Sequence, residues 1–156
     1  MLNIRIITVG KDKDRWISDG CDHYVKLLSR FAGVELKFLP TLKSTVSLSP
    51  EVIKAKESGK LAGAIGHEYY IALHDRGRAY DSPALAKRLQ QVEVDSRGTV
   101  VFVIGGAWGL DKRLLEHANE VWSLSSLTFS HQLVRLILLE QLYRAYSILR
   151  GTDYHK

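Results

Sequence analysis

The chain has 156 residues, 46% of them hydrophobic, with a formal net charge of +5, so one domain with a proper core is expected. No apolar run is long enough for a signal peptide or a membrane span, which predicts a soluble, cytoplasmic protein. The single cysteine, Cys21, excludes an internal disulfide framework and a cysteine-cluster metal site, and its spacing fits a small apolar residue on a helix face.

The first part of the chain predicts a strand, a helix and a second strand. Residues 3–10 are short, β-branched and closed by a glycine, as a strand would be. Apolar residues recur at helical spacing over 14–31, and Gly33 is the expected stop signal of that helix. Residues 34–40 predict the second strand, which ends at Pro40.

A polar loop over 41–48 precedes a helix with clear start signals. Ser49 offers a side-chain cap and Pro50 suits the first helical turn, so we expect a helix that continues to Ile65. Residues 69–75 then predict the third strand.

The second half of the chain continues the alternation of strands and helices. A loop over 76–83 leads into a helix opened by Ser82 and Pro83, and the unbroken apolar run of 99–106 predicts a strand covered on both faces. Three segments follow: a short helix over 111–119, a strand over 121–125 and a long helix over 131–150. This order predicts a single α/β domain over residues 1–156, with a largely parallel sheet of five or six strands flanked by helices.

Ligands of open α/β sheets bind beyond the carboxyl ends of the strands, where "LHDRGR", "IGGAWG" and "LSSLTF" lie here. The glycines of "IGGAWG" have neither the spacing of a dinucleotide fingerprint nor the Gly-Lys-Ser/Thr of a P-loop. Because no lysine or arginine lies between Gly105 and Leu110, a polyphosphate would be poorly neutralised. Two interpretations stay open: close approach of backbone to an uncharged or cationic ligand, or only a tight strand-to-helix turn.

The next loop, "SLSSLTFSH", alternates small hydroxyl residues with apolar ones. Backbone hydrogen bonds and apolar walls suit a purine ring, although the same loop also reads as a capped helix entry with Ser130 as the N-cap.

The helix over 131–150 is apolar on nearly every side and must therefore be covered on nearly every side. A symmetric interface with a second copy of the chain would cover it, and burial within one domain is the alternative.

Four segments resemble the RlmH family of ribosomal RNA methyltransferases: "IRIITVGK", "IALHDRG", "VFVIGGAWG" and the C-terminal "LTFSHQLVRLILLEQLYRAYSILRGTDYHK". The resemblance covers essentially the whole chain in order. It implies the SPOUT fold, an α/β methyltransferase with a C-terminal deep trefoil knot, which forms a homodimer and binds S-adenosyl-L-methionine within the knot. It further implies methylation of N3 of a pseudouridine in the 23S rRNA of the assembled ribosome.

The resemblance also implies site residues. The family's cofactor contacts correspond to the following residues: Leu73, Gly105, Leu124, Ser125, Ser126, Leu127, Thr128 and Phe129. Two positions depart from the usual pattern, because Trp108 stands where many members have an acidic or polar residue and Ser130 where many have a proline. Trp108 either stacks on a base or packs in an interface.

Methylation of a ring nitrogen requires loss of its proton, so a proton acceptor or a group that stabilises the anion is needed. The catalytic candidates are His131, Arg144, Tyr154 and His155. By resemblance the C-terminal tail reaches the partner's cofactor site, where Tyr154 and His155 would contact the target base.

Arg135 and Lys156 are the RNA-binding candidates, and Arg135 and Arg144 would hold RNA phosphate or the uracil anion. The structural alternatives are a frayed tail, a capping His131 and an Arg144–Glu140 pair at helical spacing. The remaining histidines show no metal-ligand spacing, so no metal is expected.

Three other functions are compatible with the residues. A related knotted methyltransferase would act on another RNA target, and a ribosome-binding protein would share the charge without any catalysis. A flavodoxin-like nucleotide binder is the third, which the missing phosphate motif disfavours.

Overall fold

The computed structural model describes residues 1–42 and 47–156, and within them five parallel strands form one sheet in the order β2-β1-β4-β3-β5. The strands are β1 (Leu2–Val9), β2 (Ala32–Leu39), β3 (Tyr70–Ala79), β4 (Thr99–Ile104) and β5 (Glu120–Ser123). The helices are α1 (Arg15–Leu28), α2 (Pro50–Ile65), α3 (Ser82–Asp95), α4 (Lys112–His117) and α5 (His131–Arg150). The predicted α/β architecture is confirmed, while the polar loop predicted over 41–48 lies partly outside the described residues.

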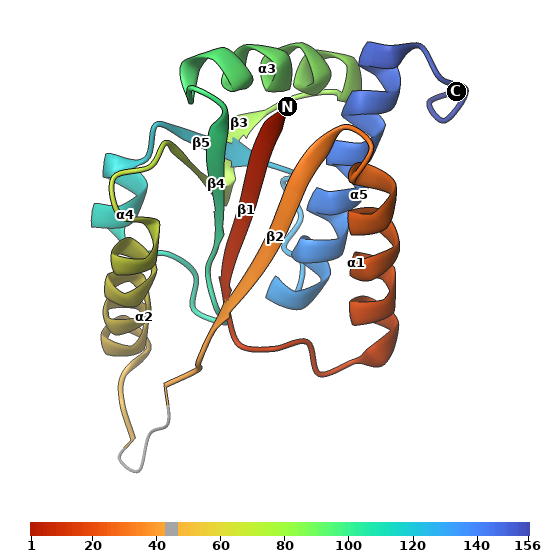
Figure 1. Ribbon diagram of the computed structural model, residues 1–156. Helices are drawn as coiled ribbons and strands as arrows, with labels where there is room; N and C mark the ends of the chain where they lie inside the picture. Colours follow the sequence, from red (N-terminus) through yellow and green to blue (C-terminus); the bar gives the residue numbers. More distant parts are fainter. Residues whose placement is uncertain (43–46) are drawn as a thin grey trace.

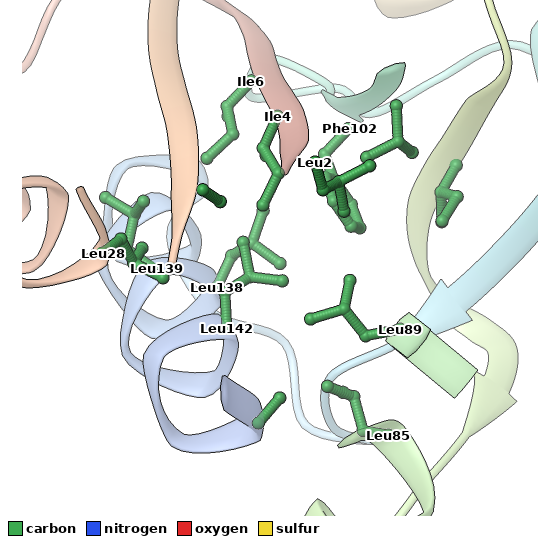
Figure 2. Packing of buried hydrophobic residues seen from close by; sticks show 14 of the residues in the cluster. Leu2, Ile4, Ile6, Leu28, Leu85, Leu89, Phe102, Leu138, Leu139 and Leu142 are labelled. Carbon is green, nitrogen blue, oxygen red and sulfur yellow. The ribbon is translucent and has the colours of Figure 1, made fainter. Parts of the chain in front are cut away.

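Helices cover both faces of the sheet (Figure 1). Side chains of β4 alternate between the two faces: Phe102 packs in a core with α1, α3 and α5, whereas Val101 and Val103 pack in a second core with α2 and α4. Figure 2 shows the first core, in which leucines of α5 meet the isoleucines of β1. The expectation that the strand over 99–106 is covered on both faces is therefore confirmed.

Cys21 belongs to this first core, as its helical spacing predicted. Burial raises the pKa of the Cys21 thiol to about 11, which keeps the sulfur protonated and unreactive at neutral pH.

Helix α5 buries one face and leaves the rest of its apolar surface partly open. Leu138, Leu139 and Leu142 are fully buried against the sheet, α1 and α3. Leu133 and Ile137 are only half-buried in the single chain. One domain therefore covers only part of this apolar helix.

The helix starts follow local capping chemistry. Ser49 Oγ accepts a hydrogen bond from the Val52 amide at 3.3 Å, and Ser130 Oγ accepts one from the Leu133 amide at 3.2 Å, so both predicted caps are confirmed. The third helix is different: the side chain of Asp81, rather than Ser82, caps α3.

Several predicted boundaries are wrong. Helix α1 ends at Leu28, and Gly33 lies inside β2, because pairing with β1 begins at Leu2↔Ala32 and extends the strand towards the N-terminus. Strand β3 continues to Ala79, where a loop was predicted, since the chain bulges after Leu73 and resumes pairing with β5 at Arg78.

Candidate active site

A cavity of about 460 Å³ lies beyond the carboxyl ends of β4 and β5 and beside the bulge in the middle of β3. The three segments that the sequence singled out meet around it together with the start of α5. All predicted cofactor residues except Ser126 line it: Leu73, Gly105, Leu124, Ser125, Leu127, Thr128 and Phe129. The topology therefore brings together residues that are far apart in the chain.

The glycines after β4 form a tight turn that closes on itself. The Gly109 amide donates a hydrogen bond to the Gly106 carbonyl at 3.0 Å, and Gly109 has a φ of +80°. A Cβ on Gly105 would lie 2.6 Å from the carbonyl carbon of Gly109. The glycines thus form a tight turn, and this turn also places bare backbone along the cavity wall.

The bulge in β3 adds two polar residues to the cavity that sequence reasoning missed. His74 and Asp75 leave the ladder between Leu73 and Arg78, and both line the cavity, with His74 Nδ1 3.2 Å from an Asp75 carboxylate oxygen. The sequence singled out the segment "LHDRGR" that contains them, but it did not select these two residues, because the strand was expected to end here.

The charge around the cavity opposes a phosphate-rich ligand. Among the described lining residues there is no lysine or arginine, and the titratable ones are His74, Asp75 and His131. A neutral or cationic ligand with an aromatic ring fits this lining better than a polyphosphate does.

His131 begins α5 and lies at the edge of the cavity. Burial, followed by the positive charges of Arg135 and Lys13, lowers the pKa of its imidazole below the ordinary value of 6.5. The neutral form therefore dominates at pH 7 and can accept a proton.

The C-terminal tail is anchored on α5 rather than frayed. The Tyr154 hydroxyl is 3.1 Å from that of Tyr24 and donates to Glu140 at 3.0 Å, while its ring packs edge-on against Tyr143. Arg144 lies 4.8 Å from the centre of the Tyr154 ring.

Arg144 connects the tail to α5. Its guanidinium pairs with Glu140 at 2.6 Å, as the helical spacing suggested, and lies 3.3 Å from His155 Nδ1. Lys156, the last residue, is exposed. The candidate residues of the tail thus form one cluster around the carboxyl end of α5.

This cluster and the cavity lie at opposite ends of α5, which has 20 residues and is therefore about 30 Å long. Figure 1 shows the chain terminus beside one end of α5, while the loops that follow β4 and β5 lie near the other end. A single chain does not bring Tyr154 or His155 to the cavity.

Arg135 lies in the interior, and the prediction that it contacts RNA is not supported. Its side chain is fully buried and forms an ion pair with Asp12, and it donates to the carbonyl oxygens of Val9 at 2.8 Å and Gly10 at 2.7 Å. Because these groups of the protein occupy its guanidinium, Arg135 links the first turns of α5 to the end of β1.

Comparison with known proteins identifies the family of this chain. A family model described as "Predicted SPOUT methyltransferase" matches residues 2–155. The chain belongs to the SPOUT methyltransferase family. Two relatives, from Clostridioides difficile (strain 630) and Leuconostoc citreum (strain KM20), are 42% and 40% identical over 159 residues. Each match covers 99% of this chain and 100% of the relative, and both relatives are called "Ribosomal RNA large subunit methyltransferase H", which confirms the resemblance to the RlmH family.

Solved structures agree at the level of the fold. A probable methylase family protein from Haemophilus influenzae Rd KW20 superposes with a TM-score of 0.58 at 13% identity, over 99% of this chain and 71% of that one. A probable methyltransferase from Bordetella pertussis Tohama I gives 0.57 at 16% identity, over 92% and 96%.

Two apolar side chains stand out at the mouth of the cavity in this SPOUT methyltransferase. Trp108 is 53% exposed and Leu127 is 68% exposed, although both line the cavity. Large apolar groups at a cavity mouth favour contact with a further molecule.

In residues 1–42 and 47–156, no helix combines the length and hydrophobicity needed to cross a bilayer. The same residues contain no group of three or more His, Cys, Asp or Glu side chains placed to hold a metal ion.

Proposed function

We propose that this protein is an S-adenosyl-L-methionine-dependent methyltransferase that methylates N3 of a pseudouridine in the 23S rRNA of the assembled ribosome. The observation that carries the proposal is the meeting of the three segments singled out from the sequence around one cavity, in a chain about 40% identical to relatives named as ribosomal RNA large subunit methyltransferases. The proposed reaction needs no metal, and the proposed location is the cytoplasm.

The residues of the cavity fit the cofactor. Apolar walls from Leu73, Leu124 and Phe129 suit an adenine ring, and the hydroxyl-bearing loop offers hydrogen bonds to its edge and to a ribose. The absence of lysine and arginine from the described lining suits a sulfonium cation, which would supply an electrophilic methyl group. The turn from Gly105 to Gly109 places backbone along the cavity wall, where the ligand would lie.

The acceptor nitrogen must lose its proton as it gains the methyl group. His131 is the proposed proton acceptor, because its neutral imidazole lies at the cavity edge. Tyr154 and His155 are proposed to contact the base, with Arg144 stabilising the uracil anion and Lys156 holding RNA phosphate.

The arrangement requires two chains. Since the tail lies at one end of α5 and the cavity at the other, the tail of a partner must complete each site. A homodimer in which two α5 helices pack side by side would also cover the half-buried Leu133 and Ile137. We further propose that the C-terminal segment forms the trefoil knot characteristic of the family.

The test is methyl transfer from labelled S-adenosyl-L-methionine to intact ribosomes that lack the modification, with free 23S rRNA alongside. The proposal expects label in the 23S rRNA of intact ribosomes and little in free RNA, because a chain this small recognises the shape of the particle. Cofactor binding without transfer would indicate another RNA target. Neither binding nor transfer would support a ribosome-binding protein without catalysis.

A further inference from the structure

A second cavity, of about 570 Å³, adjoins the first beyond the carboxyl ends of β1 and β2. The two cavities share four wall residues: Gly106, Ala107, Trp108 and His131. A molecule in the second cavity would therefore lie next to one in the first. The proposed cofactor site does not use this second space.

The second cavity is lined by a buried carboxylate, one oxygen of which has no hydrogen-bond partner among the described residues. Glu57, on α2, is only 6% exposed, and its Oε1 has no hydrogen-bond partner among the described residues. The other carboxylate of the cavity, Asp12, is bound to Arg135. A buried carboxylate oxygen without a partner is costly, so it calls for a partner such as a bound ligand, an ion or water.

The fold makes room for this carboxylate. A Cβ on Gly106 would lie 2.8 Å from Glu57 Oε1, so the glycine allows the side chain to reach the wall shared by the two cavities. Burial raises the pKa of Glu57, and the positive charge of Lys60 opposes this. A bound N–H donor would compensate for the water that the carboxylate has lost.

The other walls fit a nucleotide. Phe38 and the exposed Trp108 offer aromatic surface for a base, and Lys11 and Lys13 bring positive charge for a backbone phosphate. The first cavity has no such lysines among its described lining residues. The two cavities therefore differ in charge: the second is lined by lysines, and the described lining of the first has none.

Resting on the proposed function, we propose that the second cavity takes the acceptor base and that Glu57 accepts a hydrogen bond from N1–H of the pseudouridine. Pseudouridine is joined to its ribose through carbon, so its N1 keeps a hydrogen, whereas N1 of uridine carries the sugar and has none. Glu57 therefore distinguishes the two nucleosides. With uridine bound, the carboxylate stays unpaired in the interior, which lowers kcat/KM on the order of 100-fold.

The experiment compares ribosomes that carry pseudouridine at the target with ribosomes that carry uridine there. Methyl-transfer kcat/KM is measured for the wild type, Glu57→Ala and Glu57→Gln, and S-adenosyl-L-methionine affinity is measured by calorimetry. Glu51→Gln is the matched control, since Glu51 is exposed on the same helix. Glu57→Gln preserves the volume and serves as the test if the alanine variant does not fold.

The wild type is expected to prefer pseudouridine on the order of 100-fold, and both Glu57 variants to lose most of that preference, with the amide retaining part of it. Their cofactor affinity is expected to stay at the wild-type value. An undiminished preference in the variants would overturn the role of Glu57. So would a loss of cofactor affinity, which would assign the carboxylate to the ammonium group of the cofactor instead. An inactive wild type would instead overturn the proposed function itself.

Discussion

Some side chains of this protein stabilise the fold, and others line the candidate site. Gly105 is needed by the turn, because any Cβ would meet the backbone of Gly109, and it also lines the cavity. Arg135 and His131 are four residues apart on α5, yet one is fully buried and the other borders the cavity. Burial, rather than residue type, separates the two roles.

The buried ion pair of Arg135 gives the first prediction. Arg135→Met leaves the Asp12 carboxylate, only 6% exposed, without its cation, and should lower the free energy of unfolding by about 3–5 kcal/mol. The measurement is urea unfolding followed by circular dichroism. Arg15→Met is the control, because its partner Asp19 and its own side chain are exposed, and its cost should stay below about 0.5 kcal/mol. Equal losses in the two variants would contradict the account.

His131 gives a prediction about pH. Because its pKa lies below 6.5, the proton-accepting neutral form is retained at pH 7 and is lost as the pH falls through that lowered pKa. Methyl-transfer kcat/KM should therefore fall on the acid side, with a midpoint below pH 6.5. His131→Gln should lower the methyl-transfer rate and remove this decrease of kcat/KM at acid pH. If the variant kept the same decrease of kcat/KM at acid pH, another group would be responsible for the titration.

Helices and strands determine which side chains can meet. The bulge in β3 turns His74 and Asp75 into the cavity, and α5 separates the tail from the cavity by its own length. Each tail can therefore act only at a partner's cavity, so the length of one helix makes the proposed site depend on two chains.

Removal of the tail tests this arrangement. Deletion of residues 154–156 should abolish methyl transfer, because it removes the residues proposed to contact the base. Dimerisation and cofactor affinity should be unchanged, since the cavity and the whole of α5 remain. Sedimentation and calorimetry measure these two properties. A truncated protein with wild-type activity would remove the tail from the mechanism.

The alternation of apolar segments was enough to predict the elements, but not all of their ends. The run over 99–106 predicted a doubly covered strand, and Ser49 and Ser130 predicted helix starts, because these signals are local. The extension of β3 and the burial of Arg135 depend on partners far along the chain, which a local pattern does not contain. Glu57 was missed for the same reason, since its environment comes from Gly106.

For the whole molecule, two adjoining cavities open at one edge of a parallel sheet, and they differ in charge. One has no basic side chain among its described lining residues, whereas the other carries Lys11 and Lys13. The net charge of +5 suits an RNA partner, and a homodimer would double the basic surface offered to the ribosome.

The most direct measurement is the identity of the methylated atom. Ribosomes treated with the protein and labelled S-adenosyl-L-methionine are digested to nucleosides, and mass spectrometry with standards locates the label. The expected product is N3-methylpseudouridine from 23S rRNA. Label on any other nucleoside, or in another RNA, would contradict it.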